Sequence, residues 1–162
     1  MAKQQIDLTQ FLNQQYLCES LTIVEVQKLL EYTELVKYKK NQVIADIGEV
    51  GDALYFVVSG EAVLTYEEGG SETEVGRVSS GEMVGEMSFF DRKPRLLRMR
   101  ASRNDTQLLK LSRPMYERLR VEHPFIAVNL LEHAIISLDH LLRRVSTEEV
   151  NLARYVFGKG KR

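Results

Sequence analysis

The chain has 162 residues, of which 44% are hydrophobic and 28% are charged, as in an ordinary globular domain. This length fits one domain, and two would be crowded. The formal net charge of -1 gives the molecule as a whole no attraction to nucleic acid or to anionic lipid. The single cysteine, Cys18, excludes an internal disulfide and a cysteine-rich metal site.

The beginning of the chain is polar and has none of the apolar core that a signal peptide needs. No apolar run approaches the roughly 20 residues of a membrane-spanning helix. Together with the use of one cysteine, these features predict a cytoplasmic protein without a membrane partner.

Residues 1–35 have the pattern of a helical segment. Thr22 and Glu25 are spaced as in a capping box, in which each side chain bonds to the other residue's backbone N–H. Val26 and Leu29 follow at helical spacing. We therefore expect an amphipathic helix directly after Thr22.

Residues 36–112 consist of short apolar or β-prone runs separated by glycines. All of the chain's glycines except Gly158 and Gly160 lie in this region. Strands this short, with turns this regular, favour an antiparallel barrel or roll. The runs are 43–44, 53–58, 62–64, 75–78 and 108–111.

Residues 113–162 return to a helical pattern. Arg113 and Pro114 open a short helix, and Pro124 stands where the first turn of a longer helix tolerates proline. The apolar residues of the longer helix form two stripes, the first of them with heptad spacing. The first stripe contains Val128, Leu131, Ile135, Leu138, Leu142 and Val145, and the second contains Ile126, Leu130, Ala134 and Leu141.

A helix that is apolar on two sides needs two partners or a deep groove. We expect one stripe to cover the roll and the other to pair with a second copy of the chain, which gives a homodimer. The alternative is that both stripes are buried against the chain's own roll.

The chemistry is concentrated in the stretch 85–97, which contains Gly85, Glu86, Pro94 and Arg95. A glycine-led turn exposes backbone N–H groups that favour an anion. An arginine adds a planar, permanently charged fork for a phosphate, and a glutamate accepts hydrogen bonds from a sugar hydroxyl. The three parts together suit a phosphorylated sugar. The alternative is a simple salt bridge between Glu86 and Arg95 with no ligand.

The same stretch resembles the phosphate-binding cassette of the cyclic-nucleotide-binding domain family, which includes catabolite-activator-type regulators and kinase regulatory subunits. The segment 38–62, with its Gly-Glu-x-Gly-Asp turn at 48–52, is similar to the family's opening strands. The resemblance covers about residues 20–145. The cassette residues that match in register are Gly85, Glu86, Met87, Ser88, Phe89, Phe90, Pro94 and Arg95.

The resemblance implies a mainly β fold with flanking helices. Its centre would be a double-stranded β-helix, or jelly roll, at 36–112, followed by a C-terminal helix that serves as lid and dimer contact. Glu86 would hold the ribose 2′-hydroxyl, and Arg95 the cyclic phosphate. The remaining ligand-binding residues would be Gly85, Met87, Ser88, Leu96 and Leu97. The lid and dimer residues would be Leu131, Ile135, Leu138, Leu141 and Leu142.

Leu96 departs from the family pattern, which has alanine, serine or threonine at the position that faces the phosphate. A leucine adds three heavy atoms beyond alanine and no hydroxyl, so it crowds the phosphate. A slight shift of the backbone would preserve binding of a cyclic-AMP-like ligand. Without that shift the pocket would be vestigial, and the chain would act as a protein-interaction or dimerisation scaffold.

The expected function is a non-enzymatic cyclic nucleotide sensor that signals through its C-terminal helix to a separate effector protein, with no cofactor. Only 17 residues follow Val145, so we expect no helix-turn-helix domain and no direct DNA binding. A cupin-like metal enzyme is the less favoured alternative, because it needs histidine ligands on barrel strands. The three histidines, His123, His133 and His140, all lie in the C-terminal helical region.

Arg98 and Arg100 alternate with Leu97, Met99 and Ala101. This pattern predicts a strand with one core face and one charged face toward solvent. The alternative is a basic docking patch for an acidic partner.

Overall fold

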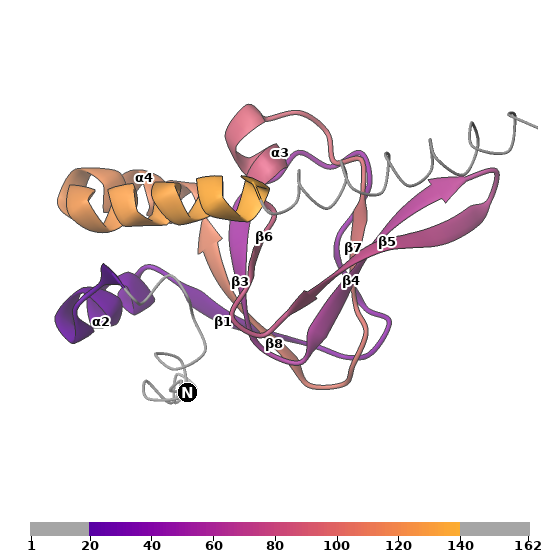
Figure 1. Cartoon of the computed structure of the whole chain (residues 1–162), viewed down its shortest axis with the longest axis horizontal. Coiled ribbons are helices and arrows are strands. Elements are labelled where there is room, and N and C mark those ends of the chain that lie inside the picture. Colours follow the sequence, from indigo (N-terminus) through magenta and orange to yellow (C-terminus); the bar gives the residue numbers. More distant parts are fainter. Residues whose placement is uncertain (1–19, 140–162) are drawn as a thin grey trace, which may run out of the picture.

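Residues 20–139 are described by a computed structural model, in which two four-stranded antiparallel sheets form a roll with helices at one side (Figure 1). The strand order is β1-β8-β3-β6 in the first sheet and β2-β7-β4-β5 in the second. The strands are β1 (Glu34–Tyr38), β2 (Val43–Ala45), β3 (Ala53–Ser59), β4 (Glu61–Glu68), β5 (Ser71–Ser79), β6 (Met83–Val84), β7 (Arg98–Ala101) and β8 (Thr106–Ser112). The helices are α2 (Ile23–Glu31), α3 (Glu86–Asp91) and α4 (Arg113–Glu122), and a further helix runs through 124–139.

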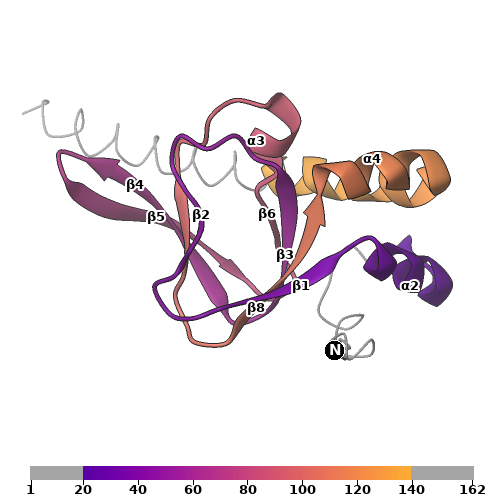
Figure 2. The same ribbon diagram turned by 180° about the vertical axis from the view of Figure 1, so that it is seen from behind.

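Apart from the β4–β5 hairpin, consecutive strands alternate between the two sheets. This winding is that of the predicted double-stranded β-helix. In both views the β4–β5 hairpin extends from the roll on the side opposite α2 and α4 (Figures 1 and 2).

Strand β3 separates two hydrophobic clusters. Because successive side chains of a strand point to opposite faces, its buried run 53–58 serves both clusters. Leu54 and Phe56 pack into the cluster that the helices cover, whereas Tyr55 and Val57 pack into the interior of the roll. The continuous apolar run in the sequence therefore marks a strand buried on both faces.

The predicted helix starts are confirmed. Thr22 and Glu25 form a complete capping box at the start of α2, and Val26 and Leu29 are buried. Ser112 caps α4 by accepting a hydrogen bond from the backbone N–H of Met115, with a distance of 3.4 Å.

Several strands differ from the predicted runs, and β1, β6 and β5 are three of them. Strand β1 begins at Glu34, two residues before the start of the predicted roll, and its short polar-apolar alternation contains no continuous apolar run. Strand β6 has only two residues, too few to form a pattern of its own. Strand β5 begins at Ser71 because the polar residues before Val75 pair with β4 in a hairpin and so become part of the strand.

The two stripes of the C-terminal helix face different surroundings. Ile126, Leu130 and Ala134 of the second stripe are buried against the roll, as predicted. Val128 and Ile135 of the first stripe are 50% and 66% exposed, so the structure does not bury both stripes on the chain's own roll. Predictions for residues 1–19 and 140–162 lie outside the described residues.

The predicted division of β7 into a core face and a charged face is confirmed, and the charged face carries a partly exposed ion-pair network. Arg98 pairs with Asp46, Glu67 and Glu72, at N–O distances of 2.7, 3.0 and 3.3 Å. Its hydrogen bond to Asp46 lowers the pKa of that carboxyl. Arg100 also pairs with Glu72, so these two arginines are engaged within the chain rather than free for an acidic partner.

None of the helices within 20–139 is long and apolar enough to cross a membrane.

Candidate functional site

A glycine turn places the first polar residue of the site. Gly85 links β6 to α3 with a φ of 92°, which glycine adopts without steric cost. A Cβ atom there would also lie 3.3 Å from the carbonyl oxygen of Ala53 and 3.4 Å from the ring of Tyr55. The turn therefore needs glycine, and it buries Glu86 at the first position of α3.

The Glu86 carboxylate is buried but only half satisfied. The side chain is 6% exposed, and its Oε1 atom accepts a hydrogen bond from the Ser137 hydroxyl at 2.9 Å. Its Oε2 atom is the one buried side-chain polar atom without a partner within residues 20–139. Burial raises the pKa of this carboxyl, while its own backbone N–H, Ser137 and Arg95 oppose the rise. The site thus holds an acceptor without a donor, which is rare in folded proteins.

Backbone pairing positions Arg95 beside this carboxylate. The Arg95 N–H donates to the Glu49 carbonyl at 2.8 Å, and the Gly48 N–H donates to the Arg95 carbonyl at 2.9 Å. The guanidinium lies against two glycines, since a Cβ on Gly51 would be 3.0 Å from Nη2 and one on Gly85 would be 3.6 Å from Nη1.

Arg95 forms no ion pair with any residue of the described part of the chain, Glu86 included. The alternative of a simple Glu86–Arg95 salt bridge is therefore wrong. Main-chain bonds fix the backbone of Arg95, the guanidinium lies against the two glycines, and the Glu86 carboxylate accepts from Ser137 of the C-terminal helix instead.

Ser88 bonds to the backbone that surrounds the site. Its hydroxyl accepts from the Gly51 N–H at 2.7 Å and donates to the Lys93 carbonyl at 2.6 Å. It therefore fixes the return of the chain from α3 to Arg95.

The other predicted ligand-binding residues have different exposures. Met87 is exposed, and Leu97 is partly buried. The Leu96 side chain is 81% exposed, so it takes up no buried space beside Arg95. Below the glycine turn, Tyr55 is buried in the roll, and this burial raises its pKa to about 12.

The lid role of the predicted residues stays a prediction, and the hydrogen bond from this helix to Glu86 comes from another residue. Leu131 packs partly against the core, Ile135 is exposed and Leu138 is half-buried. Leu141 and Leu142 lie outside the described residues. The contact is made by Ser137, which the sequence analysis missed because a serine between two apolar stripes carries no signal of its target 51 residues away.

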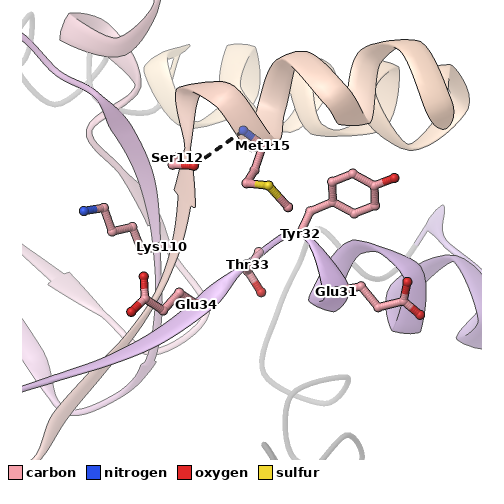
Figure 3. A pocket seen from close by; sticks show the side chains of 7 residues that line it. All are labelled: Glu31, Tyr32, Thr33, Glu34, Lys110, Ser112 and Met115. Carbon is pink, nitrogen blue, oxygen red and sulfur yellow. Dashed lines mark hydrogen bonds between the residues drawn. The ribbon is translucent and has the colours of Figure 1, made fainter. Parts of the chain in front are cut away.

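A pocket of about 260 Å³ lies away from this site, where α2 and β1 face β8 and α4 (Figure 3). Its lining residues are Glu31, Tyr32, Thr33, Glu34, Lys110, Ser112 and Met115. The Tyr32 hydroxyl donates to Glu122, and the Thr33 hydroxyl donates to the Leu30 carbonyl. Because these groups are bonded within the chain, the pocket offers no counterpart to Glu86 Oε2.

The described residues also contain no group of three or more histidine, cysteine or acidic side chains arranged to hold a metal ion. His123 instead packs edge-on against the ring of Tyr32, with ring centres 5.8 Å apart. Nothing in residues 20–139 therefore supports the cupin-like alternative.

Comparison with known protein families and sequences agrees with the geometry. The model of the family described as "Cyclic nucleotide-binding domain" matches residues 35–123, more than half of the chain. A cAMP-dependent protein kinase regulatory subunit from Mucor circinelloides is 33% identical over 85 residues, which are 52% of this chain and 20% of that protein. The Lysophospholipase nte1 of Aspergillus fumigatus is 32% identical over 117 residues, which are 72% of this chain and 8% of that protein. The chain thus spans a fifth or less of the length of these two relatives.

Solved structures show the same architecture. The catabolite activator protein of Thermus thermophilus is 32% identical and superposes with a TM-score of 0.67 over 87% of this chain and 63% of that one. A cyclic nucleotide-binding domain from Methylobacillus flagellatus superposes with a TM-score of 0.77 over 89% and 80% of the two chains, a likeness of fold at 21% identity. The matched family is one of regulatory rather than catalytic domains. With its two sheets wound into a roll, its flanking helices and its family match, the chain belongs to the cyclic nucleotide-binding domain family.

Proposed function

We propose that this chain is a non-catalytic sensor domain that binds cyclic AMP or a closely related cyclic nucleotide at Glu86 and Arg95. The observation that carries the proposal is the buried, unpartnered Oε2 atom of Glu86. A buried polar group without a partner costs about 1–3 kcal/mol of stability. A ligand hydroxyl that donates to Oε2 removes this cost, so the free energy lost in the empty protein is recovered on binding.

The second half of the ligand is recognised by charge. The Arg95 guanidinium forms no ion pair within the described residues, lies against Gly51 and Gly85, and is near enough to Glu86 to lower the pKa of that carboxyl. A guanidinium binds a phosphate through two parallel hydrogen bonds. A ribose hydroxyl on Glu86 and a cyclic phosphate on Arg95 therefore satisfy both groups with one molecule.

The exposure of Leu96 supports binding over a vestigial pocket. A leucine that crowded the phosphate would have to project into the space next to Arg95. Its side chain instead lies largely in solvent. We therefore assign Leu96 to the rim of the site.

The signal would leave the site through the C-terminal helix. Ser137 connects that helix to Glu86, and the same helix carries the exposed residues Val128 and Ile135. We propose that this stripe pairs two copies of the chain and that a separate effector protein in the cytoplasm reads the change. Relatives named as cAMP-dependent protein kinase regulatory subunits support the control of another protein.

The test is calorimetry of the purified chain with cyclic AMP. We expect saturable binding, and Arg95→Lys should weaken it at least about tenfold because lysine keeps the charge and loses the planar fork. Arg120→Lys, at an exposed arginine of α4, is the matched control and should bind like the parent. Leu96→Ala should leave the affinity within a factor of about three.

Two results would contradict the proposal. One is a folded parent that gives no saturable heat with cyclic AMP or cyclic GMP. The other is an Arg95→Lys variant that binds as tightly as the parent. In the first case the dimerisation scaffold becomes the better account, since the exposed stripe at Val128 and Ile135 stands without a nucleotide.

A further inference from the structure

Arg113, the first residue of α4, reaches across to the back of the candidate site. Its Nη2 atom donates to the carbonyl oxygens of Gly51 and Phe89, each at 2.7 Å. The guanidinium carbon lies 4.4 Å from the centre of the Phe89 ring. The backbone N–H of Arg113 also donates to the Asp52 carbonyl at 2.8 Å. One residue thus joins α4, the turn at 48–52 and α3.

Gly51 lies between Arg113 and Arg95 and is in contact with both. Its N–H donates to the Ser88 hydroxyl, and its carbonyl accepts from Arg113. A Cβ at this position would lie 2.8 Å from the backbone nitrogen of Phe89 and 3.0 Å from the guanidinium of Arg95. The Gly51 peptide therefore has Arg113 on its carbonyl and Arg95 against its α-carbon.

Helix α3 needs such an external contact. It has only six residues, and a helix that short is unstable alone because few of its backbone bonds are internal. Its carbonyl at Phe89 lies in the last turn, where carbonyl groups lack helical partners. Arg113 satisfies this carbonyl while its guanidinium lies over the Phe89 ring. A lysine can donate but cannot stack in this way.

We infer that Arg113 is a positioning residue for the nucleotide site. It holds α3 and the Gly51 turn in the arrangement that brings Glu86 and Arg95 to the same ligand. The part of this inference that concerns affinity rests on the proposed function. The part that concerns the frame, which is α3 and the Gly51 turn, applies to the free protein as well. The two parts of the inference can therefore fail separately.

Hydrogen exchange in the ligand-free protein tests the frame. In Arg113→Gln, the amides of Gly51, Phe89 and Arg92 should exchange about tenfold faster or more, because their bonds to Ser88 and within α3 open more often. The amides of β4 should keep their parent rates. Arg118→Gln is the matched control, since Arg118 lies in the same helix but bonds to Glu122.

Calorimetry at a temperature well below the melting transition tests the consequence for binding. Arg113→Gln should weaken cyclic AMP binding by about tenfold, and Arg118→Gln should leave it unchanged. Arg113→Lys should fall between Arg113→Gln and the parent in both measurements. It also replaces Arg113→Gln if that variant does not fold.

The outcomes separate the two proposals. A parent that binds no cyclic nucleotide overturns the proposed function, and the exchange rates still decide the role of Arg113. Exchange that is unchanged at Gly51, Phe89 and Arg92, or that rises equally in β4, overturns the positioning role. Faster local exchange with parent-like affinity overturns the link between the frame and the ligand.

Discussion

At the scale of single residues, Glu86 carries a cost that the fold alone does not require. Desolvation disfavours its charged form and raises its pKa, and one of its oxygens has no partner. Proteins retain such groups mainly where they serve a function at the expense of stability. The cost should therefore be visible in the pH dependence of unfolding.

We expect Glu86→Gln to be more stable than the parent at pH 7, by about 1 kcal/mol, because it removes a buried charge. A carboxyl whose pKa is raised on folding stabilises the protein below its unfolded-state pKa. That contribution is lost as the pH rises through the raised value. The gain of the variant should therefore shrink as the pH falls through the raised pKa of Glu86, and it should be gone below the ordinary glutamate value of about 4.5.

Urea unfolding at pH 7 and at pH 4 measures both effects, and calorimetry should show that cyclic AMP binding is weakened. Glu82→Gln, at a partly buried glutamate near the start of β6, serves as the control. A Glu86→Gln variant that is less stable than the parent at pH 7 would show that the carboxylate is needed for folding.

Glu86 and Arg95 could be selected from the sequence because both lie within one stretch of 13 residues that resembles the family's cassette, whereas spacing alone left a simple salt bridge open. The contacts of Ser137 and Arg113 could not be predicted in this way. Ser137 bonds across 51 residues and Arg113 across 62, and each is set by how a helix packs on the roll. A pattern of neighbouring residues contains no information on contacts between residues so far apart in the sequence.

At the scale of elements, helix 124–139 has an apolar face that the roll does not cover. Ile126, Leu130 and Ala134 are buried, while Val128 and Ile135 on another side are half exposed or more. An exposed apolar stripe next to a buried one is typical of a helix that also packs against a partner.

We expect Ile135→Asp to convert a dimer into a monomer, because it buries a charge in the seam. Multi-angle light scattering at several protein concentrations measures the mass. Val24→Asp, at a comparably exposed valine of α2, is the control and should leave the mass unchanged. A parent that is monomeric at all concentrations, or an Ile135→Asp variant that stays dimeric, would show that the stripe is not the seam.

The helices and strands were predicted correctly where the sequence had a strong local pattern. The capping box at Thr22 and the doubly buried run of β3 gave correct boundaries within one or two residues. Strands β1 and β6 were not predicted, because they are defined by pairing with β8 and β3 and not by their own composition.

At the scale of the whole molecule, the fold brings three segments that are far apart in the sequence to one place. The roll closes the segment 48–52 against the cassette of 85–97, and the C-terminal helix reaches the same point through Ser137. Under the proposed function, one small ligand would contact the roll and, through Glu86, the helix. A ligand shifts the position of the helix only if it binds the two positions with different affinity.

The most direct measurement is an NMR titration of the isotopically labelled chain with cyclic AMP. The account predicts saturable shifts of the amide signals of Gly85, Glu86 and Arg95, with smaller shifts at Ser137, and none at the pocket lined by Thr33 and Lys110. Shifts confined to that pocket, or no saturable shift at the first three residues, would contradict the assignment of the site.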